Sequence, residues 1–153
     1  MKLLKLSRDR LFPAFQEPLA EVSLQDWRDN PQGHADATAL RISNEVSLAD
    51  VKCDLAGFSV IILDFPKFKD GRAYSQARLL RERYGYTGEI RARGEILRDQ
   101  LLFMARCGFD AFEFAGETEG ANAALGEFSF VYQPAADGAT PVWRQRLARA
   151  AAA

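Results

Sequence analysis

The sequence predicts an α/β fold in which repeated βα units form a parallel sheet flanked by helices. Two observations favour it. A helical pattern, a Gly-aromatic pair and a β-rich run follow one another three times, with the pairs at Gly57-Phe58, Gly85-Tyr86 and Gly108-Phe109. The glycines are 28 and 23 residues apart, which fits βα units with short connections and therefore parallel neighbouring strands.

The glycine of each junction stands where a helix is expected to end. A helix often stops on a residue in the left-handed conformation, which glycine adopts at no steric cost. The aromatic residue that follows can pack back on the last helical turn. We therefore expect left-handed glycines at the three junctions.

The chain has 153 residues, of which 48% are hydrophobic, enough for one domain with a substantial core. Within it we distinguish an N-terminal arm over residues 1–36, an α/β core over 37–134, and a C-terminal loop, helix and tail over 135–153. The arm is expected to be irregular because helix breakers interrupt it, at Pro13, Pro18, Pro31 and Gly33.

Three amphipathic patterns predict the helices of the core. Ser47 begins a capping box, and the helix after it should end at Gly57. Asp70 is placed to cap the second helix, whose small alanines would let it lie close to the sheet. The apolar positions of the three helices are, in order, Leu48, Val51 and Leu55; Ala73, Ala77, Leu80 and Tyr84; and Ile96, Leu97, Leu101, Phe103, Met104 and Cys107.

The run 58–65 is almost unbroken apolar and β-branched, which is typical of a central strand covered by helices on both sides. A short helix over 118–125, a final strand over 127–132 and a terminal helix over 142–153 complete the pattern. Four successive βα units could form an open doubly wound sheet or half of a barrel that a second copy completes, so a homo-oligomer is compatible with the sequence. We favour the open sheet.

The charge balance narrows the range of partners. Twenty basic and twenty-one acidic side chains leave a net charge of −1, which argues against nucleic acid or an anionic membrane as the partner. No run approaches the roughly 20 apolar residues of a membrane span, and the first apolar stretches are too short for a signal peptide. We expect a cytoplasmic protein.

Metal and cofactor signatures are missing from the sequence. Cys53, Cys107 and His34 are too few and too scattered for a protein-bound metal, and the cysteines are expected to act as small apolar residues. The chain has no GxGxxG, GxxxxGK[ST], GxSxG or HExxH motif. We predict no metal and no cofactor, and the sequence leaves open whether the chain is an enzyme.

The clearest functional signal is a group of arginines. Residues 71–107 contain eight arginines, no lysine and four acids, in a chain that is otherwise near neutral. Guanidinium groups beside helix N-termini suit a small oxyanion, and the carboxyl ends of parallel strands are the usual ligand-binding edge. The alternative is that all eight arginines cover solvated helix surface and pair with acids. The arginines expected to bind an anion at the edge are Arg72, Arg91, Arg93 and Arg98.

Four further side chains are expected to support this edge: Asp64, Lys67, Asp70 and Asp99. Asp64 ends an apolar strand, where a carboxylate either acts as a general base or, more commonly, fixes the loop that follows. Asp70 is more often a helix cap than a catalyst. No catalytic residue can be assigned from these patterns.

The run from Asp64 to Phe114, DFPKFKDGRAYSQARLLRERYGYTGEIRARGEILRDQLLFMARCGFDAFEF, closely resembles the core of a bacterial family known as domain of unknown function 934. The resemblance extends to FSFVYQP and TPVWRQR. Members of that family are typically encoded beside genes for sulfite reductase and adenylylsulfate-type reductase, and are often labelled probable oxidoreductases of sulfite reduction. The resemblance implies a role in assimilatory sulfate or sulfite reduction, with sulfite reductase or another enzyme of that pathway as a partner.

Two hypotheses follow for the function. In the favoured one, the chain is an accessory protein that binds a small sulfur oxyanion or the reductase through the edge from Arg72 to Asp99, and an exposed apolar or arginine-rich patch is expected. In the alternative, it is an oxidoreductase-type enzyme of sulfite reduction whose cofactor a partner supplies. The alternative predicts one concave pocket in which Asp64, Arg72, Arg93 and Asp99 converge.

Overall fold

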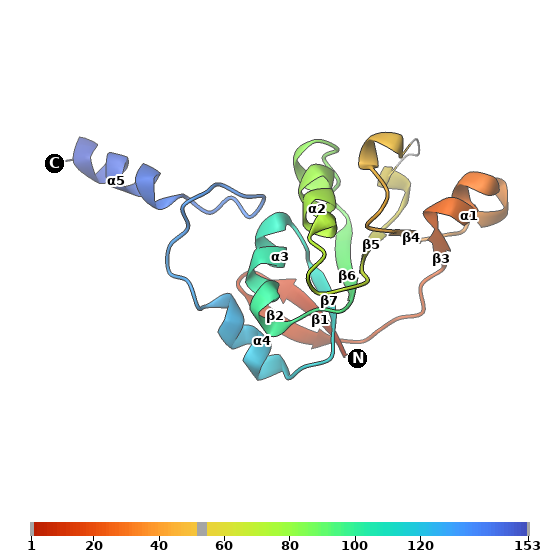
Figure 1. The fold of residues 1–153 in the computed structure, drawn as a ribbon, viewed down its shortest axis with the longest axis horizontal. Helices are drawn as coiled ribbons and strands as arrows, with labels where there is room; N and C mark the ends of the chain where they lie inside the picture. Colours follow the sequence, from red (N-terminus) through yellow and green to blue (C-terminus); the bar gives the residue numbers. More distant parts are fainter. Residues whose placement is uncertain (1, 52–54, 153) are drawn as a thin grey trace.

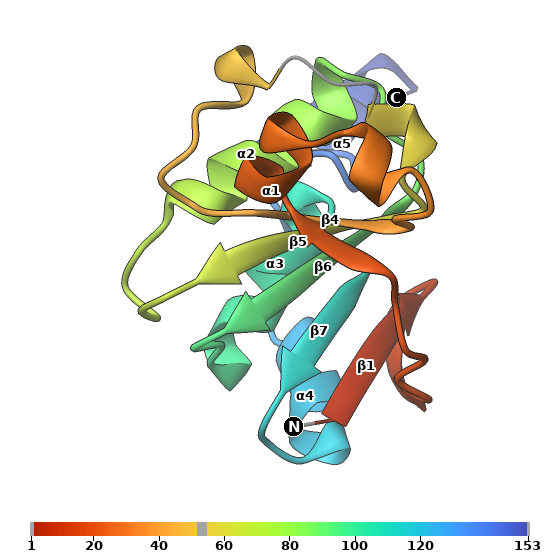
Figure 2. The same cartoon turned by 90° about the vertical axis from the view of Figure 1, so that its right-hand side faces the viewer.

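The fold is built on one mixed sheet. The computed structural model describes residues 2–51 and 55–152. The strands lie in the order β2-β1-β7-β6-β5-β4-β3 (Figure 1 and Figure 2). Strands β3 to β7 are parallel, whereas β1 is antiparallel to both β7 and β2. The strand bounds are β1 Lys2–Ser7, β2 Arg10–Ala14, β3 Glu21–Ser23, β4 Ala39–Ile42, β5 Val60–Phe65, β6 Glu89–Gly94 and β7 Ala111–Phe114.

Helices connect the parallel strands and follow the last one. Because the sheet runs from β2 at one edge to β3 at the other, it is open and does not close into a barrel. The α/β class and the open sheet are therefore confirmed. None of the helices among the described residues is long and apolar enough to cross a membrane. The helices are α1 Leu24–Asp29, α2 Arg72–Glu82, α3 Leu101–Cys107, α4 Thr118–Leu125 and α5 Val142–Ala151, with 3-10 turns η1 Gln32–His34, η2 Leu48–Asp50, η3 Leu55–Gly57 and η4 Arg98–Gln100.

The helices that pack on the sheet lie on one of its faces. Strands β3 to β7 follow one another in space as they do along the chain. Right-handed crossovers that always step in the same direction place every connecting helix on the same side. Figure 2 shows α2, α3 and α4 behind the strands. The expected doubly wound arrangement, with helices on both sides of residues 58–65, is therefore wrong.

The main core fills the space between this face and the helices. Ile61, Leu63 and Phe65 of β5 are fully buried there. Ala73 and Ala77 of α2 belong to the same cluster and are also fully buried. The small alanines let the helix lie close to the sheet, as predicted, and the close contact gives the interior its packing density.

The second face of the sheet is covered by a linker instead of a helix. A small apolar cluster of Ala39, Val60 and Ile62 lies on this side, with Leu19 packed against it. Leu19 belongs to residues 15–20, which run from β2 at one edge to β3 at the other and cross in front of the sheet in Figure 2. One extended segment thus keeps the apolar part of this face from solvent.

Residues 1–36 are not the irregular arm that the sequence suggested. Strand β1 pairs with β7 and brings Leu4 into the core with no exposed surface. Pro13 lies in β2, an edge strand, where the missing N–H removes no necessary hydrogen bond. Pro18 lies in the linker. These prolines exclude a long helix, but they are compatible with short strands and an extended linker. The predicted irregular arm did not take this into account.

The Gly-aromatic junctions behave differently from one another. Gly85 and Gly108 are left-handed as predicted, with φ of 62° and 106°. Gly108 ends α3, and its N–H donates to the Ala105 carbonyl at 3.0 Å. Gly57 is not left-handed, because it closes the 3-10 turn η3 and not an α-helical turn. The prediction for Gly57 is wrong.

The helix predicted from Ser47 to Gly57 is replaced by the turns η2 and η3. The predicted cap hydrogen bond from the Ser47 side chain is not formed. Leu48 and Leu55 are nevertheless buried, so the apolar pattern marked core positions although it did not form an α-helix. The part of the prediction on residues 52–54, with Cys53, lies outside the described residues.

Two further predictions need correction, whereas the helix over 118–125 is confirmed. The helix α3 starts only at Leu101, after the turn η4, and the change of phase leaves Leu97 and Phe103 exposed. Residues 127–132 do not form a strand, and they pair with none of the seven strands of the sheet. Their alternating aromatic residues remain exposed instead.

Candidate functional site

The second face of the sheet carries a row of paired charges. Successive residues of a strand point to opposite faces, so every second position turns away from the helices. We call the eight charged side chains at these positions in β1 and in β3 to β7 the charged face. It holds as many basic groups as acidic ones, and its members are Lys5, Glu21, Arg41, Asp64, Glu89, Arg91, Arg93 and Glu113.

Arg93 lies at the centre of the charged face. Its Nε and Nη2 donate to the carboxylate of Glu113 at 2.8 and 2.9 Å, and its Nη1 donates to Glu21 at 2.9 Å. The hydrogen bonds with Glu113 raise the pKa of Arg93 further, so it is always charged. A bidentate pair of this kind is strong and geometrically specific. Every nitrogen of the guanidinium is already engaged within the protein.

Arg91 is buried, with 4% of its side chain exposed. Its Nε donates to Glu89 at 2.8 Å, and Glu89 also pairs with Lys5 at 2.7 Å. Its Nη1 has no hydrogen-bond partner among the described residues, and the Glu113 carboxylate is 4.0 Å away. Arg91 and Arg93 line a cavity of about 240 Å³ together with the linker 15–20. This nitrogen is the one guanidinium donor of Arg91 and Arg93 that the described residues leave without a hydrogen bond or a close ion pair.

Asp64 also points onto the charged face. Its carboxylate lies 3.8 Å from Arg41 Nε. Burial raises the pKa of Asp64, and the nearby guanidinium groups of Arg41 and Arg93 act in the opposite direction. Asp64 therefore lies opposite basic side chains on the sheet.

Arg72 lies at a different place, the start of α2. Its Nη2 is 2.7 Å from Asp70 and 3.8 Å from Glu45. Asp70 also accepts a hydrogen bond from the backbone N–H of Arg72 at 3.2 Å, although the N-cap position is Gly71. The hydrogen bonds from the Arg72 side chain lower the pKa of Asp70 to about 2. Lys67, just before this pair, is exposed.

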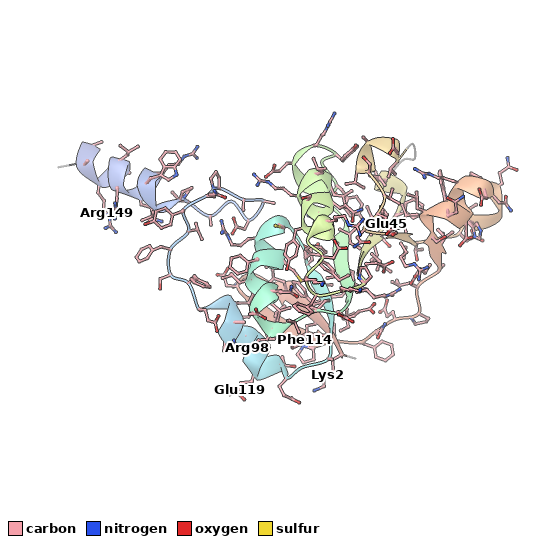
Figure 3. The ribbon with its side chains drawn as sticks, in the orientation of Figure 1. Lys2, Glu45, Arg98, Phe114, Glu119 and Arg149 are labelled. Atoms are coloured by element: carbon pink, nitrogen blue, oxygen red, sulfur yellow. The ribbon has the colours of Figure 1, made fainter. Side chains whose placement is uncertain are left out.

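Arg98 lies at a third place, against α4. Its Nη2 pairs with Glu127 at 2.7 Å, and its Nε donates to the Gly120 carbonyl at 3.0 Å. Asp99 beside it is exposed. Figure 3 shows Arg98 next to α4 and Glu45, which neighbours Arg72, on a separate part of the molecule.

The predicted site residues are thus divided among three places. The charged face holds Arg91, Arg93 and Asp64, and the remaining five lie at the start of α2 or beside α4. The single pocket that the enzyme hypothesis predicts is not formed, because Asp64 lines one cavity and Arg93 a different one. Each of the four predicted arginines has a carboxylate partner within the chain.

Two glutamines fix the loops at the carboxyl ends of the strands. The Nε2 of Gln76, in α2, donates to the carbonyls of Ser43 and Val46 at 2.9 and 2.8 Å. The Nε2 of Gln100 donates to the Phe68 carbonyl at 2.6 Å. The role of Gln76 was not predicted. The signal that could have identified it is a polar residue between the buried apolar positions of α2.

A row of exposed aromatic residues follows α4. We call residues 126–152 the C-terminal arm. Phe128, Phe130 and Tyr132 in this arm are 59%, 63% and 73% exposed. Arg106 fastens the arm to α3, since its Nη2 donates to the Gln133 carbonyl at 2.6 Å. Beyond this point α5 stands away from the sheet (Figure 1). The alternating pattern of these aromatic residues predicted a strand, and a strand would have buried one of its faces, so the sequence did not predict that all three side chains are exposed.

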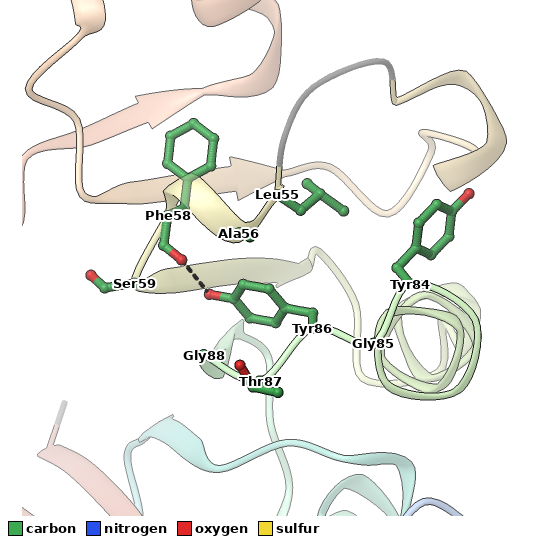
Figure 4. Close-up of a pocket in the computed structure, with 9 residues that line it drawn as sticks. All are labelled: Leu55, Ala56, Phe58, Ser59, Tyr84, Gly85, Tyr86, Thr87 and Gly88. Atoms are coloured by element: carbon green, nitrogen blue, oxygen red, sulfur yellow. Dashed lines mark hydrogen bonds between the residues drawn. The ribbon is translucent and has the colours of Figure 1, made fainter.

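A cavity of about 440 Å³ lies at the amino ends of β5 and β6, between two of the Gly-aromatic junctions (Figure 4). Its described lining has no charged side chain. The Tyr86 hydroxyl donates to the Phe58 carbonyl at 3.0 Å, and burial raises the pKa of Tyr86 to about 12. This phenol stays protonated near neutral pH and holds the loop before β6 against the start of β5.

The fold and these sites define an α/β protein with one helical face, one face of paired charges and an exposed aromatic arm. A family model of bacterial proteins of unknown function, DUF934, matches residues 39–143. The chain belongs to this family, which confirms the resemblance found in the sequence. The match begins at β4 and ends at the second residue of α5. No curated protein and no solved structure matches the chain.

Proposed function

We propose that this protein is an accessory protein of assimilatory sulfate or sulfite reduction that binds an enzyme of that pathway, such as sulfite reductase. The pathway follows from what the family resemblance implies. The binding role is supported by one observation above all, the exposed aromatic row Phe128, Phe130 and Tyr132.

Exposed aromatic side chains that stand together favour a protein-binding role. Aromatic residues are enriched at the centres of protein interfaces, and contiguous apolar patches on a protein surface usually mark interaction sites. The row is held in place by Arg106 and by the contact of the Phe128 and Phe103 rings, whose centroids are 6.0 Å apart. A fixed row of this kind loses little conformational freedom on binding.

The alternative, an oxidoreductase-type enzyme that uses a partner's cofactor, has less support. It requires acids and bases converging around one reacting group. Asp64 and Arg93 line different cavities, and Arg72 forms its ion pair at the start of α2. Because Arg72, Arg91, Arg93 and Arg98 each pair with a carboxylate of the chain, a structural role is favoured for most of these guanidinium groups.

Binding to purified sulfite reductase from the same bacterium tests the proposal. We expect the wild-type chain to form a complex and the variant Phe130→Ser/Tyr132→Ser to lose it. The matched control is Phe15→Ser, because Phe15 is 82% exposed but lies in the linker. Lack of a complex with the wild-type chain at low ionic strength would overturn the proposal.

A sulfur oxyanion is the second candidate ligand, and one observation favours it. Arg91 Nη1 is buried without a hydrogen-bond partner among the described residues, beside the cavity that it shares with Arg93. An anion oxygen placed there would satisfy this donor. Calorimetry with sulfite, sulfate and adenylylsulfate should give binding that Arg91→Gln removes and that Arg83→Gln, an exposed control, leaves unchanged. Equal titrations for wild type and Arg91→Gln would contradict an anion site here.

A further inference from the structure

We propose that α5 is the recognition helix of the C-terminal arm and that it binds in an apolar groove with an acidic rim on the partner protein. This inference rests on the proposed binding function. It identifies the surface, the geometry and the charge of the partner site. The side chains that would enter the groove are Trp143, Leu147 and Ala150, which we call the α5 stripe.

The α5 stripe has the spacing of a helix that binds in a groove. Its residues are at positions i, i+4 and i+7, which place them on one face of a helix. Trp143 and Leu147 are 44% and 64% exposed, and no residue of α5 is buried. A helix of ten residues without tertiary packing is marginal in water. Docking would give this helix the packing that it lacks.

The rest of the arm holds α5 so that the stripe faces away from it. Phe130 and Tyr132 line a cavity of about 280 Å³ with a different side of α5, which presents Val142, Gln145, Arg146 and Arg149. The Val142 N–H donates to the Val131 carbonyl at 2.8 Å. None of the stripe residues lines that cavity. The helix is thereby anchored on one side and free on the other.

The charges of α5 indicate the character of the groove. The helix contains Arg144, Arg146 and Arg149 and no acidic residue. All three are exposed, and no carboxylate in the described part of the chain forms an ion pair with them. The Arg144 guanidinium lies 5.1 Å from the centre of the Trp143 ring, at the border of the stripe. Carboxylates around the groove would complement these groups.

A second copy of the chain is a less favourable partner than another protein. The five cavities of about 240 to 440 Å³ that described residues line have no excess of acidic over basic side chains. A lipid surface fits less well than a protein, because the stripe has only two large apolar residues and continues in alanines. Small residues favour close contact with a protein backbone over insertion among acyl chains.

The test measures the affinity of the full chain for purified sulfite reductase, at about 50 mM and about 300 mM salt. We expect Trp143→Ala/Leu147→Ala to weaken binding by about 30-fold or more, as truncation of central aromatic anchors does. Arg144→Gln/Arg149→Gln should weaken binding mainly at the lower salt concentration and so reduce the salt dependence, because two of the three positive charges of α5 are removed. Phe12→Ala, at an exposed position of the edge strand β2, is the matched control and should change little. All variants should keep the wild-type urea midpoint, because they change no buried side chain.

The outcomes separate this inference from the proposed function. Wild-type binding that Trp143→Ala/Leu147→Ala leaves intact would overturn the inference and leave the accessory function standing. No binding by the wild-type chain would overturn both. Stripe-dependent binding to phosphatidylglycerol vesicles, or stripe-dependent self-association in sedimentation, without binding to the reductase would also overturn the inference, since the occupant would then be a membrane or a second copy.

Discussion

Glu113 connects Arg91, which is buried, with Arg93, which is partly buried, on the charged face. Its side chain is 6% exposed, it holds Arg93 through two hydrogen bonds, and it lies 4.0 Å from Arg91 Nη1. Burying charged groups is unfavourable unless each is paired and hydrogen-bonded. The carboxylate is therefore needed for both guanidinium groups to stay inside the protein.

Replacing Glu113 by Gln should lower the free energy of unfolding by about 3 kcal/mol, because it removes the buried carboxylate between Arg91 and Arg93 and leaves each arginine with one carboxylate partner, Glu89 or Glu21. Urea unfolding measures the change. The matched control is Glu82→Gln, which removes an exposed pair with Arg78 and should cost at most about 0.5 kcal/mol. A loss for Glu113→Gln no larger than that of the control would show that the charged face is not held by this pair.

Asp70 and Asp64 should respond to acid in opposite directions. The pKa of Asp70 falls from 3.8 to about 2 on folding, so its stabilisation is complete above 3.8 and is lost as the pH falls toward 2. The pKa of Asp64 rises on folding, so its ionisation lowers stability as the pH rises through the folded value. Arg72 and Arg41, respectively, are the charges that face them.

Urea midpoints between pH 6 and pH 3 check these two directions. The advantage of wild type over Asp70→Asn should shrink as the pH falls. The stability of wild type relative to Asp64→Asn should instead increase as the pH falls, because the folded state binds the Asp64 proton more tightly than the unfolded state does. If the difference in urea midpoint between wild type and variant changed in the same direction with pH for both variants, the opposite pKa shifts of Asp70 and Asp64 would be contradicted.

At the scale of the elements, the junction glycines form a graded series. Gly57 has an ordinary backbone and open space at its Cβ position, Gly85 is left-handed with open space, and Gly108 is left-handed and crowded. A Cβ on Gly108 would lie 2.5 Å from Arg81 Cγ. Arg81 in turn donates to the Gly108 carbonyl at 3.0 Å, so the two residues cannot move apart independently.

Alanine substitutions should follow this series. We expect Gly57→Ala to change the free energy of unfolding by less than about 0.5 kcal/mol. Gly85→Ala should cost about 1 kcal/mol for the left-handed backbone, and Gly108→Ala about 2 kcal/mol or more once the contact with Arg81 is added. Thermal or urea unfolding of the three variants gives the order. Equal losses at all three positions would show that backbone conformation does not set the cost.

Local patterns predicted individual elements well where the decisive interactions are local. The helix over 118–125 and the end of α3 at Gly108 follow from caps and apolar spacing. The turns η2 and η3 do not, because Leu48 and Leu55 reach the core without an α-helix between them. The alternation from Phe128 to Tyr132 is the opposite case: the local pattern is that of a strand, but the segment pairs with none of the seven strands.

At the scale of the whole molecule, the order of the strands places the helices on one face of the sheet, and the sequence predicts this arrangement only in part. The run 89–94 alternates Glu89, Arg91 and Arg93 with Ile90 and Ala92, the pattern of a strand with only one face against helices. The sheet order that confirms this depends on contacts between distant segments. The arginines were recognised as unusual, but their carboxylate partners come from strands that only the tertiary fold brings together.

The position of β1 between β7 and β2 has a consequence for how the chain is made. Leu4 pairs with Phe112, 108 residues later, so β1 and β2 must wait for the last parallel strand before they can join the sheet. At a synthesis rate of about 5–20 residues per second, that interval is about 5–20 s on the ribosome. During it the apolar side of the first hairpin has no sheet to pack against. Completion of this sheet is therefore a late event, and the nascent hairpin of β1 and β2 is the segment that molecular chaperones would have to protect.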